Sequence, residues 1–415
     1  MSTSPYRAPG PDDAVLGKMP GAVAEPASIE EAAAVVGETS RDGKSLLFVG
    51  GGTDLEVGGV PESLGVLLST RRLDRVVEHA PSDQIAVVEA GVSLASLAKV
   101  LASHGQRLAL DPPLPERATV GGVIAANAFG PRRARYGTAR DLLIGVTLVR
   151  ADGRLARGGG KVVKNVAGFD MPRLMAGSLG TLGLVATATF RLHPLPEASA
   201  TLSAAGLAPG TLRALLGRIR DAQLEPDSVV AFRAGEGRFD LAVRFEGFRP
   251  SVAAQRDRLA RLCAESSLGV EALDEAAARA VWARHDAARR AGTVRVKVAA
   301  LPSALESVER GAFAPLSDAL GDGASVWYPT LGLGFAGGSL RDPASVAAAV
   351  AALGAARRTL TEGGGSLVLL AAPEAVRAAV DPWGGTPSAL GLMRAVKLRL
   401  DPGRRLAPGR FVGGI

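Results

Sequence analysis

Short continuous runs of apolar residues alternate along the chain with longer stretches in which apolar residues recur at helical spacing. The run at residues 46–49 (LLFV) leads directly into the segment GGGTD at residues 50–54. Four apolar residues bounded by glycines predict a short buried strand. Three consecutive glycines can adopt backbone angles that other residues avoid, so several N–H groups can converge on a phosphate or pyrophosphate. The same pattern also fits an ordinary turn at the end of a strand.

Two further glycine-rich stretches lie downstream. Residues 111–130 combine three prolines with a run of small side chains, along which the backbone can approach something flat and extended. Residues 177–183 (GSLGTLG) precede a strand at 184–192, whose alternation predicts that it is half buried. Their spacing is not the dinucleotide fingerprint and no Walker motif occurs, so the Rossmann and P-loop interpretations are disfavoured. Three such stretches, each next to a strand, favour a phosphate-binding site over separate turns.

The rest of the pattern predicts helices and strands in mixed order. Ser28 and Glu31 form a capping box at the start of a helix that is expected to end near Gly37. Beyond Pro194 and Pro196, strands alternate with helices in an α+β pattern with an antiparallel sheet, and no sequence repeat is visible. The strands predicted there are 229–233, 239–245, 294–298, 325–328 and 366–370, and the helices are 212–221, 252–265, 271–289, 343–361 and 391–400.

Composition narrows the function classes. Hydrophobic residues make up 47% of the 415 residues, which is enough for buried cores, and aromatic residues make up only 4%. The net charge is +7, but the arginines are scattered and only Arg132, Arg133 and Arg135 cluster tightly. With so few aromatic residues for base stacking, this charge favours an anionic cofactor and small acids over nucleic acid.

Cysteine and histidine usage excludes further classes. Cys263 is the only cysteine, so these residues cannot hold an iron–sulfur cluster by themselves, and no disulfide is expected. The four histidines show no metal-ligand spacing, and we expect no metal site. The longest apolar stretch, 346–356, is too short to cross a bilayer and the N-terminus has no secretory pattern, so a cytoplasmic protein without a transmembrane segment is expected.

Taken together, these segments resemble the flavoprotein family that includes vanillyl-alcohol oxidase and D-lactate dehydrogenases. Residues 50–55 (GGGTDL), 118–130 and 177–183 are similar to its three FAD motifs. Within the family, the resemblance is greatest to the FAD-binding E subunits of bacterial glycolate oxidases. Residues 130–133 (GPRR) and 163–170 (VKNVAGFD) carry it, and residues 173–175 (RLM), 400–403 (LDPG) and 408–411 (PGRF) support it.

The resemblance implies a fold and a division of the chain. The expected fold class is α+β, with a two-part PCMH-type FAD-binding domain and a ferredoxin-like antiparallel α+β cap domain. The expected divisions are a loose N-terminal arm at 1–25, the FAD-binding domain at 26–196, the cap domain at 197–386, and a C-terminal helix and tail at 387–415 that return to the FAD-binding domain.

The resemblance also implies the cofactor contacts. The pyrophosphate would be held by Gly50, Gly51, Gly52, Thr53 and Asp54. The flavin and its ribityl chain would be lined by Pro113, Thr119, Gly121, Gly122, Ala126, Asn127 and Gly130, and the remainder would meet Gly180 and Val185. Many relatives attach FAD through a histidine in the first loop, where this chain has Thr53, so FAD is expected to be non-covalent. Two further departures are Leu179 in place of an acidic residue and Ala407 in place of an asparagine.

The family's catalytic subunits carry a His- and Gly-rich motif in the cap domain that does not occur here, and no catalytic residue is assigned. His285 is expected on the solvated face of a charged helix. Arg132 and Arg133 are candidates to bind a substrate carboxylate bidentately, or else form a solvated or subunit-facing pair. Lys164 is a similar candidate, with a structural role as the alternative.

The implied function is an FAD-binding subunit of a glycolate oxidase (glycolate dehydrogenase) complex that oxidises glycolate to glyoxylate. Its partners would be a homologous FAD-linked catalytic subunit and an iron–sulfur subunit that takes the electrons, and the complex would be cytoplasmic or attached to the inner face of the plasma membrane through partner subunits. Two alternatives stay open. One is a self-sufficient FAD-linked dehydrogenase for D-lactate or another 2-hydroxy acid, and the other is a non-catalytic assembly subunit.

Overall fold

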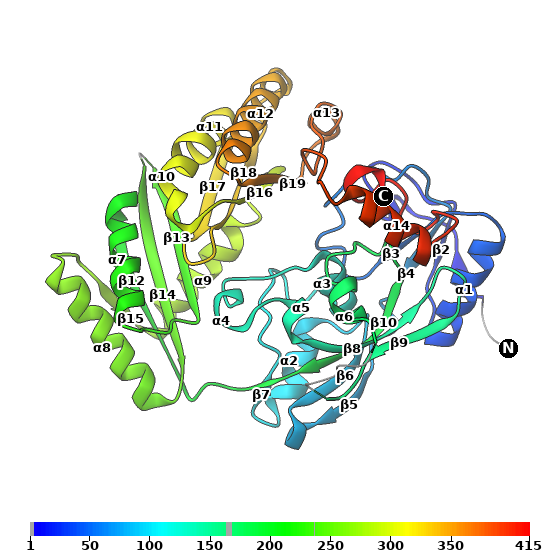
Figure 1. Ribbon diagram of the computed structural model, residues 1–415, viewed down its shortest axis with the longest axis horizontal. Helices are drawn as coiled ribbons and strands as arrows, with labels where there is room; N and C mark the ends of the chain where they lie inside the picture. The colour runs from blue at the N-terminus through cyan, green and yellow to red at the C-terminus, as the bar shows by residue number, and fades with distance from the viewer. Residues whose placement is uncertain (1–3, 163–167, 236) are drawn as a thin grey trace. The chain divides into compact units, whose positions relative to one another are not determined.

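The computed structural model describes residues 4–162, 168–235 and 237–415. The chain divides into two compact units. Unit 1 comprises residues 1–130, 136–195 and 385–415, and unit 2 comprises residues 131–135 and 196–384 (Figure 1). The predicted boundaries at 196 and 386 lie within two residues of these divisions. The candidate residue Lys164 falls outside the described residues.

The first sheet of unit 1 has the strand order β1-β2-β4-β3. Strand β3 (Leu46–Val49) is the predicted strand before the glycines, and it pairs in parallel with β4 (Val66–Ser69), which in turn pairs with β2 (Ala22–Ala24). Helix α1 (Ile29–Arg41) begins at Ser28, whose Oγ accepts from the Glu31 N–H at 3.1 Å, so the predicted N-cap is confirmed. The helix continues past Gly37 instead of ending there, and Gly37 packs against the backbone of Asp152 and Gly153.

The N-terminal segment is not a loose arm, and that prediction was wrong. Strand β1 (Tyr6–Arg7) pairs with β2, and Val15 is completely buried. The Arg7 guanidinium binds both carboxylate oxygens of Asp13, at 2.7 and 2.9 Å. The abundance of Pro, Gly and Ala suggested disorder, but an edge strand and one buried side chain hold the segment in place.

The second sheet of unit 1 is antiparallel, in the order β5-β6-β10-β8-β9. Its strands are β5 (Val76–Ala80), β6 (Ile85–Glu89), β8 (Leu143–Val149), β9 (Leu155–Gly159) and β10 (Leu184–Arg191). Strand β10 is buried on both faces, not half buried as predicted. Val185 and Ala188 join one apolar cluster, whereas Leu184 and Ala186 join another. The pattern failed here because every side chain of this central strand meets a packed layer.

The remaining elements of unit 1 are short. They are α2 (Leu94–Ala102), β7 (Gln106–Arg107), α3 (Val120–Ala126), α5 (Ala139–Leu142), α6 (Met171–Met175), β11 (His193–Pro194) and α14 (Leu390–Leu400), and α4 (Arg133–Tyr136) spans the division between the units.

Unit 2 contains one eight-stranded antiparallel sheet in the order β15-β12-β14-β13-β17-β18-β16-β19. The first half is β12 (Ala198–Leu207), α7 (Pro209–Asp221), β13 (Ser228–Gly235), β14 (Arg238–Gly247), α8 (Arg249–Glu265) and β15 (Glu271–Leu273). The second half is β16 (Val294–Ala299), α10 (Leu305–Val308), a π-helical turn (Glu309–Phe313), α11 (Ala314–Ala319), β17 (Gly321–Tyr328), β18 (Leu333–Ser339), α12 (Val346–Glu362) and β19 (Ser366–Ala371), followed by α13 (Glu374–Arg377).

Each half follows the β-α-β-β-α-β order of a ferredoxin-like motif, with its first and third strands in the centre. Strands β13 and β17 join the two halves edge to edge, through the pairs Ala231↔Trp327 and Phe232↔Val326. The unit is therefore a structural repeat that the sequence did not reveal, because the helices and strands recur but the residues that fill them do not.

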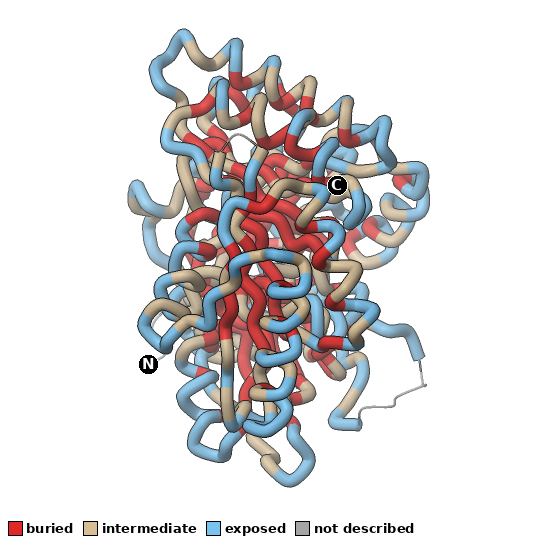
Figure 2. The backbone as a smooth tube through the Cα atoms, turned by 90° about the vertical axis from the view of Figure 1, so that its left-hand side faces the viewer, coloured by how far each residue is buried: buried red, intermediate tan, exposed pale blue. Residues whose placement is uncertain are grey.

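The two faces of this sheet differ. Trp327 belongs to the large apolar core that the long helices cover. Its neighbour Tyr328 points to the opposite face, where it contacts helix α9 (Glu275–Ala288). Buried residues are concentrated in the strands (Figure 2). Among the described residues, no helix has the length and apolar character needed to cross a membrane.

Candidate cofactor site

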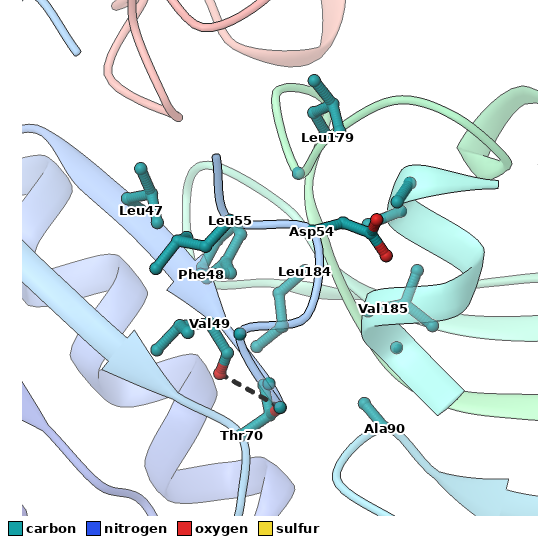
Figure 3. A pocket seen from close by; sticks show the side chains of 18 of the residues that line it. Leu47, Phe48, Val49, Asp54, Leu55, Thr70, Ala90, Leu179, Leu184 and Val185 are labelled. Carbon is teal, nitrogen blue, oxygen red and sulfur yellow. Dashed lines mark hydrogen bonds between the residues drawn. The ribbon is translucent and has the colours of Figure 1, made fainter. Parts of the chain in front are cut away.

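Unit 1 contains a cleft with an empty volume of about 810 Å³, including open solvent at its mouth (Figure 3). It is lined by Leu47, Phe48, Val49, Gly50, Gly51, Gly52, Thr53, Asp54, Leu55, Thr70, Ala90, Gly121, Gly122, Ala125, Ala126, Ser178, Leu179, Gly180, Gly183, Leu184, Val185 and Arg410. All three glycine-rich stretches therefore contribute to one site.

The first two stretches are held together by Thr119. Its Oγ1 accepts hydrogen bonds from the N–H groups of Gly51 and Gly122, both at 3.4 Å. A Cβ at Gly50 would lie 2.0 Å from that Oγ1. A Cβ at Gly51 would lie 1.6 Å from the carbonyl oxygen of Arg117. These two glycines are thus required because two protein loops approach each other closely. The sequence interpretation had explained them only by contact with the cofactor.

The first loop also supplies donors that the protein does not use. Within the described chain, the N–H groups of Gly50, Gly52, Thr53 and Asp54 donate no hydrogen bond. Gly52 has a φ of +71°, and a Cβ there would meet only open space. Unpaired backbone donors at the wall of a cleft require an acceptor from outside the protein. Their arrangement fits the oxygens of a diphosphate.

The second stretch provides a wall without bulky side chains. Helix α3 carries Gly121, Gly122, Ala125 and Ala126 toward the cleft. The Gly121 N–H donates to the Ala90 carbonyl at 2.8 Å, which fixes the helix against the end of β6. Small side chains let a flat ring system approach the helix closely.

Four residues expected at the cofactor do not line this cleft. They are Pro113, Thr119, Asn127 and Gly130. Gly130 packs against Asp111, since a Cβ there would lie 2.0 Å from the Asp111 carbonyl oxygen. Asn127 has a left-handed φ of 47°, and its buried Oδ1 has no hydrogen-bond partner. This orphaned oxygen can accept a hydrogen bond from a bound group.

The third stretch is hydrogen-bonded to the end of α3. The N–H groups of Gly177 and Leu179 donate to the carbonyls of Ile124 and Ala125, each at 2.9 Å. Leu179 has a φ of 51° and Gly180 a φ of 73°, so both lie in the left-handed region. For leucine this conformation costs roughly 1–2 kcal/mol. The turn therefore holds Leu179 at the cleft wall at the expense of backbone strain.

Sequence reasoning missed the residues that anchor the C-terminal segment to this site. The Lys397 ammonium group is 3% exposed and donates to the Thr181 carbonyl at 2.7 Å, the Leu406 carbonyl at 2.8 Å and Asp401 Oδ2 at 2.7 Å. Burial lowers the pKa of Lys397, and the hydrogen bond to Asp401 opposes this effect. The spacing of Lys397 and Asp401, one helical turn apart, was a signal that could have indicated the pair.

Arg410 anchors the first loop in a similar way. Its guanidinium donates to the carbonyls of Leu55, Val57 and Gly59, at 2.6 to 2.8 Å. In addition, the Leu46 N–H donates to the Arg405 carbonyl at 2.8 Å, and the Ala407 N–H donates to the Leu46 carbonyl at 2.7 Å. The C-terminal segment thus lies beside β3 and fixes the loop that follows it.

Two of the three candidate catalytic residues, Arg132 and Arg133, lie in unit 2. Arg132 lies in unit 2, where its guanidinium binds Glu246 Oε1 at 2.8 Å and lies 4.0 Å from Asp227 Oδ2. Arg244 completes this buried network with Asp227, whose pKa is raised by burial. Arg133 is partly exposed in α4. The network occupies the guanidinium of Arg132 within its own unit.

His285 is not a solvated surface histidine, and that prediction was wrong. It is 1% exposed, because α9 packs this side of the helix against the sheet. One ring nitrogen, Nε2, lies 2.6 Å from the Tyr328 hydroxyl, and the other, Nδ1, lies 2.8 Å from Asp286 Oδ1. Burial lowers the pKa of His285. Both ring nitrogens therefore have protein partners.

Comparison with known proteins agrees with the cleft. Residues 20–159 match the family described as "FAD binding domain". A D-lactate dehydrogenase of Archaeoglobus fulgidus is 38% identical over 174 residues, which are 41% of this chain and 38% of that protein. Glycolate oxidase subunit GlcE of Escherichia coli is 34% identical over 219 residues, which are 52% of this chain and 60% of that protein. The chain thus matches less than two thirds of the length of either relative.

Among solved structures, an alkyldihydroxyacetonephosphate synthase covers 95% of this chain with a TM-score of 0.72 at 16% identity, and 78% of that chain is covered. This likeness concerns the fold alone, and it confirms the predicted α+β class with a PCMH-type FAD-binding part and a ferredoxin-like antiparallel part. Unit 1 therefore contains an FAD-binding domain. The cofactor of this domain is FAD.

Proposed function

We propose that the chain is the FAD-binding subunit of a glycolate oxidase (glycolate dehydrogenase) complex. The observation that carries the proposal is the cleft of unit 1, which is lined by the unpaired N–H groups of Gly50, Gly52, Thr53 and Asp54 and by small residues of α3. The relatives support the reaction class, because a glycolate oxidase subunit and a D-lactate dehydrogenase both bear names of enzymes that act on 2-hydroxy acids.

The residues of this chain would hold the cofactor as follows. The N–H groups of Gly50, Gly52 and Thr53 bind the diphosphate, and Thr119 keeps that loop against α3. Thr53 stands where a histidine would form a covalent link, so binding is non-covalent. When bound, FAD supplies the two-electron acceptor for oxidation of glycolate to glyoxylate.

The side chains available for catalysis and electron transfer in this chain favour a role within a complex. The ring nitrogens of His285 are both engaged, and Arg132 is paired with Glu246, so neither side chain is ready to act on a substrate. Arg133 and Lys164 remain the candidates to bind a carboxylate. The chain holds one cysteine, Cys263, which is buried, so an iron–sulfur subunit is the proposed acceptor, and a homologous FAD-linked subunit is the proposed host of hydroxy-acid oxidation. Attachment to the membrane surface would come through these partners.

The test is an absorption spectrum of the purified chain, followed by anaerobic addition of glycolate and, separately, D-lactate. A flavin spectrum that acid precipitation releases into the supernatant is expected for non-covalent FAD. Bleaching by glycolate alone would place the oxidation in this chain, and no bleaching by either acid would assign it an electron-relay role beside the catalytic subunit. A colourless protein, with no flavin after reconstitution, would contradict the proposal and leave an assembly role.

A second candidate function is a self-sufficient FAD-linked dehydrogenase for D-lactate or another 2-hydroxy acid. The 38% identity to the Archaeoglobus fulgidus enzyme favours it. Turnover of D-lactate by the isolated chain with an artificial electron acceptor would establish this function in place of the first.

A further inference from the structure

Helix α14 has one face that the protein does not cover. Leu392 and Leu398 are 69% and 50% exposed, and Arg394 and Arg399 are also exposed. At 3.6 residues per turn these side chains spread over one half of the helix, with Leu392 and Arg399 opposite the buried Lys397 and Arg394 nearest to it. Exposed leucines that alternate with arginines on one helix face are typical of a protein interface.

The charge of this region is concentrated and unbalanced. Residues 385–415 contain six basic residues and one acidic residue, a net charge of +5 out of +7 for the whole chain. The one acid, Asp401, is buried and paired with Lys397. Within the described residues, Arg394, Arg399 and Arg404 are exposed and form no ion pair, although Arg394 donates to the Gly413 carbonyl at 3.0 Å and Arg404 to the Gly414 carbonyl at 3.4 Å. In the part of the chain that the structure describes, the surface of this segment therefore carries three arginines that no ion pair neutralises, and the Glu62 side chain packs against Gly409 and Gly414.

The inner side of the same helix is connected to the cofactor site. Lys397 donates to the Thr181 carbonyl, and Thr181 belongs to the turn whose residues 178–180 line the cleft. A protein bound to the outer face of α14 would lie one helix away from that turn. This is a suitable place for a partner that exchanges electrons with the bound cofactor.

We propose that the face formed by Leu392, Arg394, Leu398 and Arg399 docks an acidic surface of the electron-accepting partner subunit. The inference rests on the proposed function, since it names the contact surface within that complex. A protein is favoured over a lipid surface, because the exposed cations of α14 are arginines, which are enriched at protein interfaces, whereas two leucines on an 11-residue helix offer little apolar area for insertion into a bilayer.

The experiment compares two double variants in the intact complex, purified through a tag on this chain. Leu398→Glu/Arg399→Glu reverses the character of the docking face. Leu301→Glu/Arg258→Glu makes the same changes at an exposed leucine and an exposed arginine of unit 2 and serves as the control. The docking variant is expected to bind the partner about 100-fold more weakly, while the control keeps wild-type affinity. Both variants are expected to keep the flavin spectrum, which separates lost docking from a lost cofactor.

A photo-crosslinker at position 392 identifies what covers the face. Crosslinks to an acidic segment of the co-purifying iron–sulfur subunit are expected. Wild-type affinity in the docking variant would overturn the proposal, as would crosslinks only to a second copy of this chain. If the docking variant kept its affinity for the partner but no longer bound vesicles that contain phosphatidylglycerol, the face would bind a lipid surface and the proposal would be overturned. Absence of any partner from the wild-type preparation would overturn it as well, whereas the proposed cofactor function would fail separately, by absence of flavin.

Discussion

The buried Lys397–Asp401 pair allows the attachment of the C-terminal segment to be tested. Replacing Lys397 by Met keeps most of the side-chain volume but removes a donor to three acceptors, the carbonyls of Thr181 and Leu406 and the Asp401 carboxylate. Asp401 is 1% exposed and would keep only the Leu406 N–H, at 2.8 Å, as a donor. Breaking a buried ion pair typically costs about 3–5 kcal/mol, so we expect unit 1 to lose about that much stability in Lys397→Met.

The double variant Lys397→Met/Asp401→Asn separates the charge from the hydrogen bonds. It removes the uncompensated carboxylate, and the remaining loss should be about 1–3 kcal/mol, from the two carbonyls left without a donor. The assay is urea unfolding, with the release of FAD as the signal that reports unfolding of unit 1. Tryptophan fluorescence reports a different part of the molecule, because Trp282, Trp327 and Trp383 all lie in unit 2.

That tryptophan signal supplies an internal control. We expect its transition to stay unchanged in both variants, while FAD release shifts to lower urea in the single variant and partly recovers in the double. A single variant that loses less than about 1 kcal/mol would refute the assigned role of Lys397, as would a double variant no more stable than the single.

Two further predictions concern single positions. Gly51→Ala places a Cβ 1.6 Å from the Arg117 carbonyl oxygen, so the first loop must move and the purified protein should lose its flavin absorbance; Gly217→Ala, in α7 with open space around it, should keep the flavin and gain about 0.5–1 kcal/mol. The hydrogen bonds from Arg7 lower the pKa of Asp13 from 3.8 to about 2, so this carboxylate stabilises the N-terminal segment above pH 4 and the stabilisation is lost as the pH falls toward 2. Limited proteolysis of that segment should become faster across this range in the wild type, and Asp13→Asn should be cut rapidly at pH 6 and show little further change on acidification.

Local patterns predicted the elements that depend on neighbouring residues. The N-cap at Ser28 and the strand before the glycines were both confirmed, whereas the Glu31 carboxylate accepts from the Ala27 N–H and not from Ser28, so the capping box is incomplete. Predictions failed where the deciding contact comes from far along the chain. Helix α1 continues through Gly37, where the backbone of Asp152 and Gly153 packs against it. His285 is buried because the charged helix that bears it lies across a sheet.

The candidate site also combines features that follow from the local sequence with features that depend on contacts from far along the chain. The sequence by itself determined where the three glycine-rich stretches lie, since missing side chains are a property of the residues. Only the tertiary structure decided that Gly50 and Gly51 are needed for the approach of Thr119 and Arg117. It also decided that Lys397 and Arg410 tie the C-terminal segment to the turns at residues 181 and 55–59. Those bonds join residues more than 200 positions apart, and no local pattern encodes the packing that brings them together.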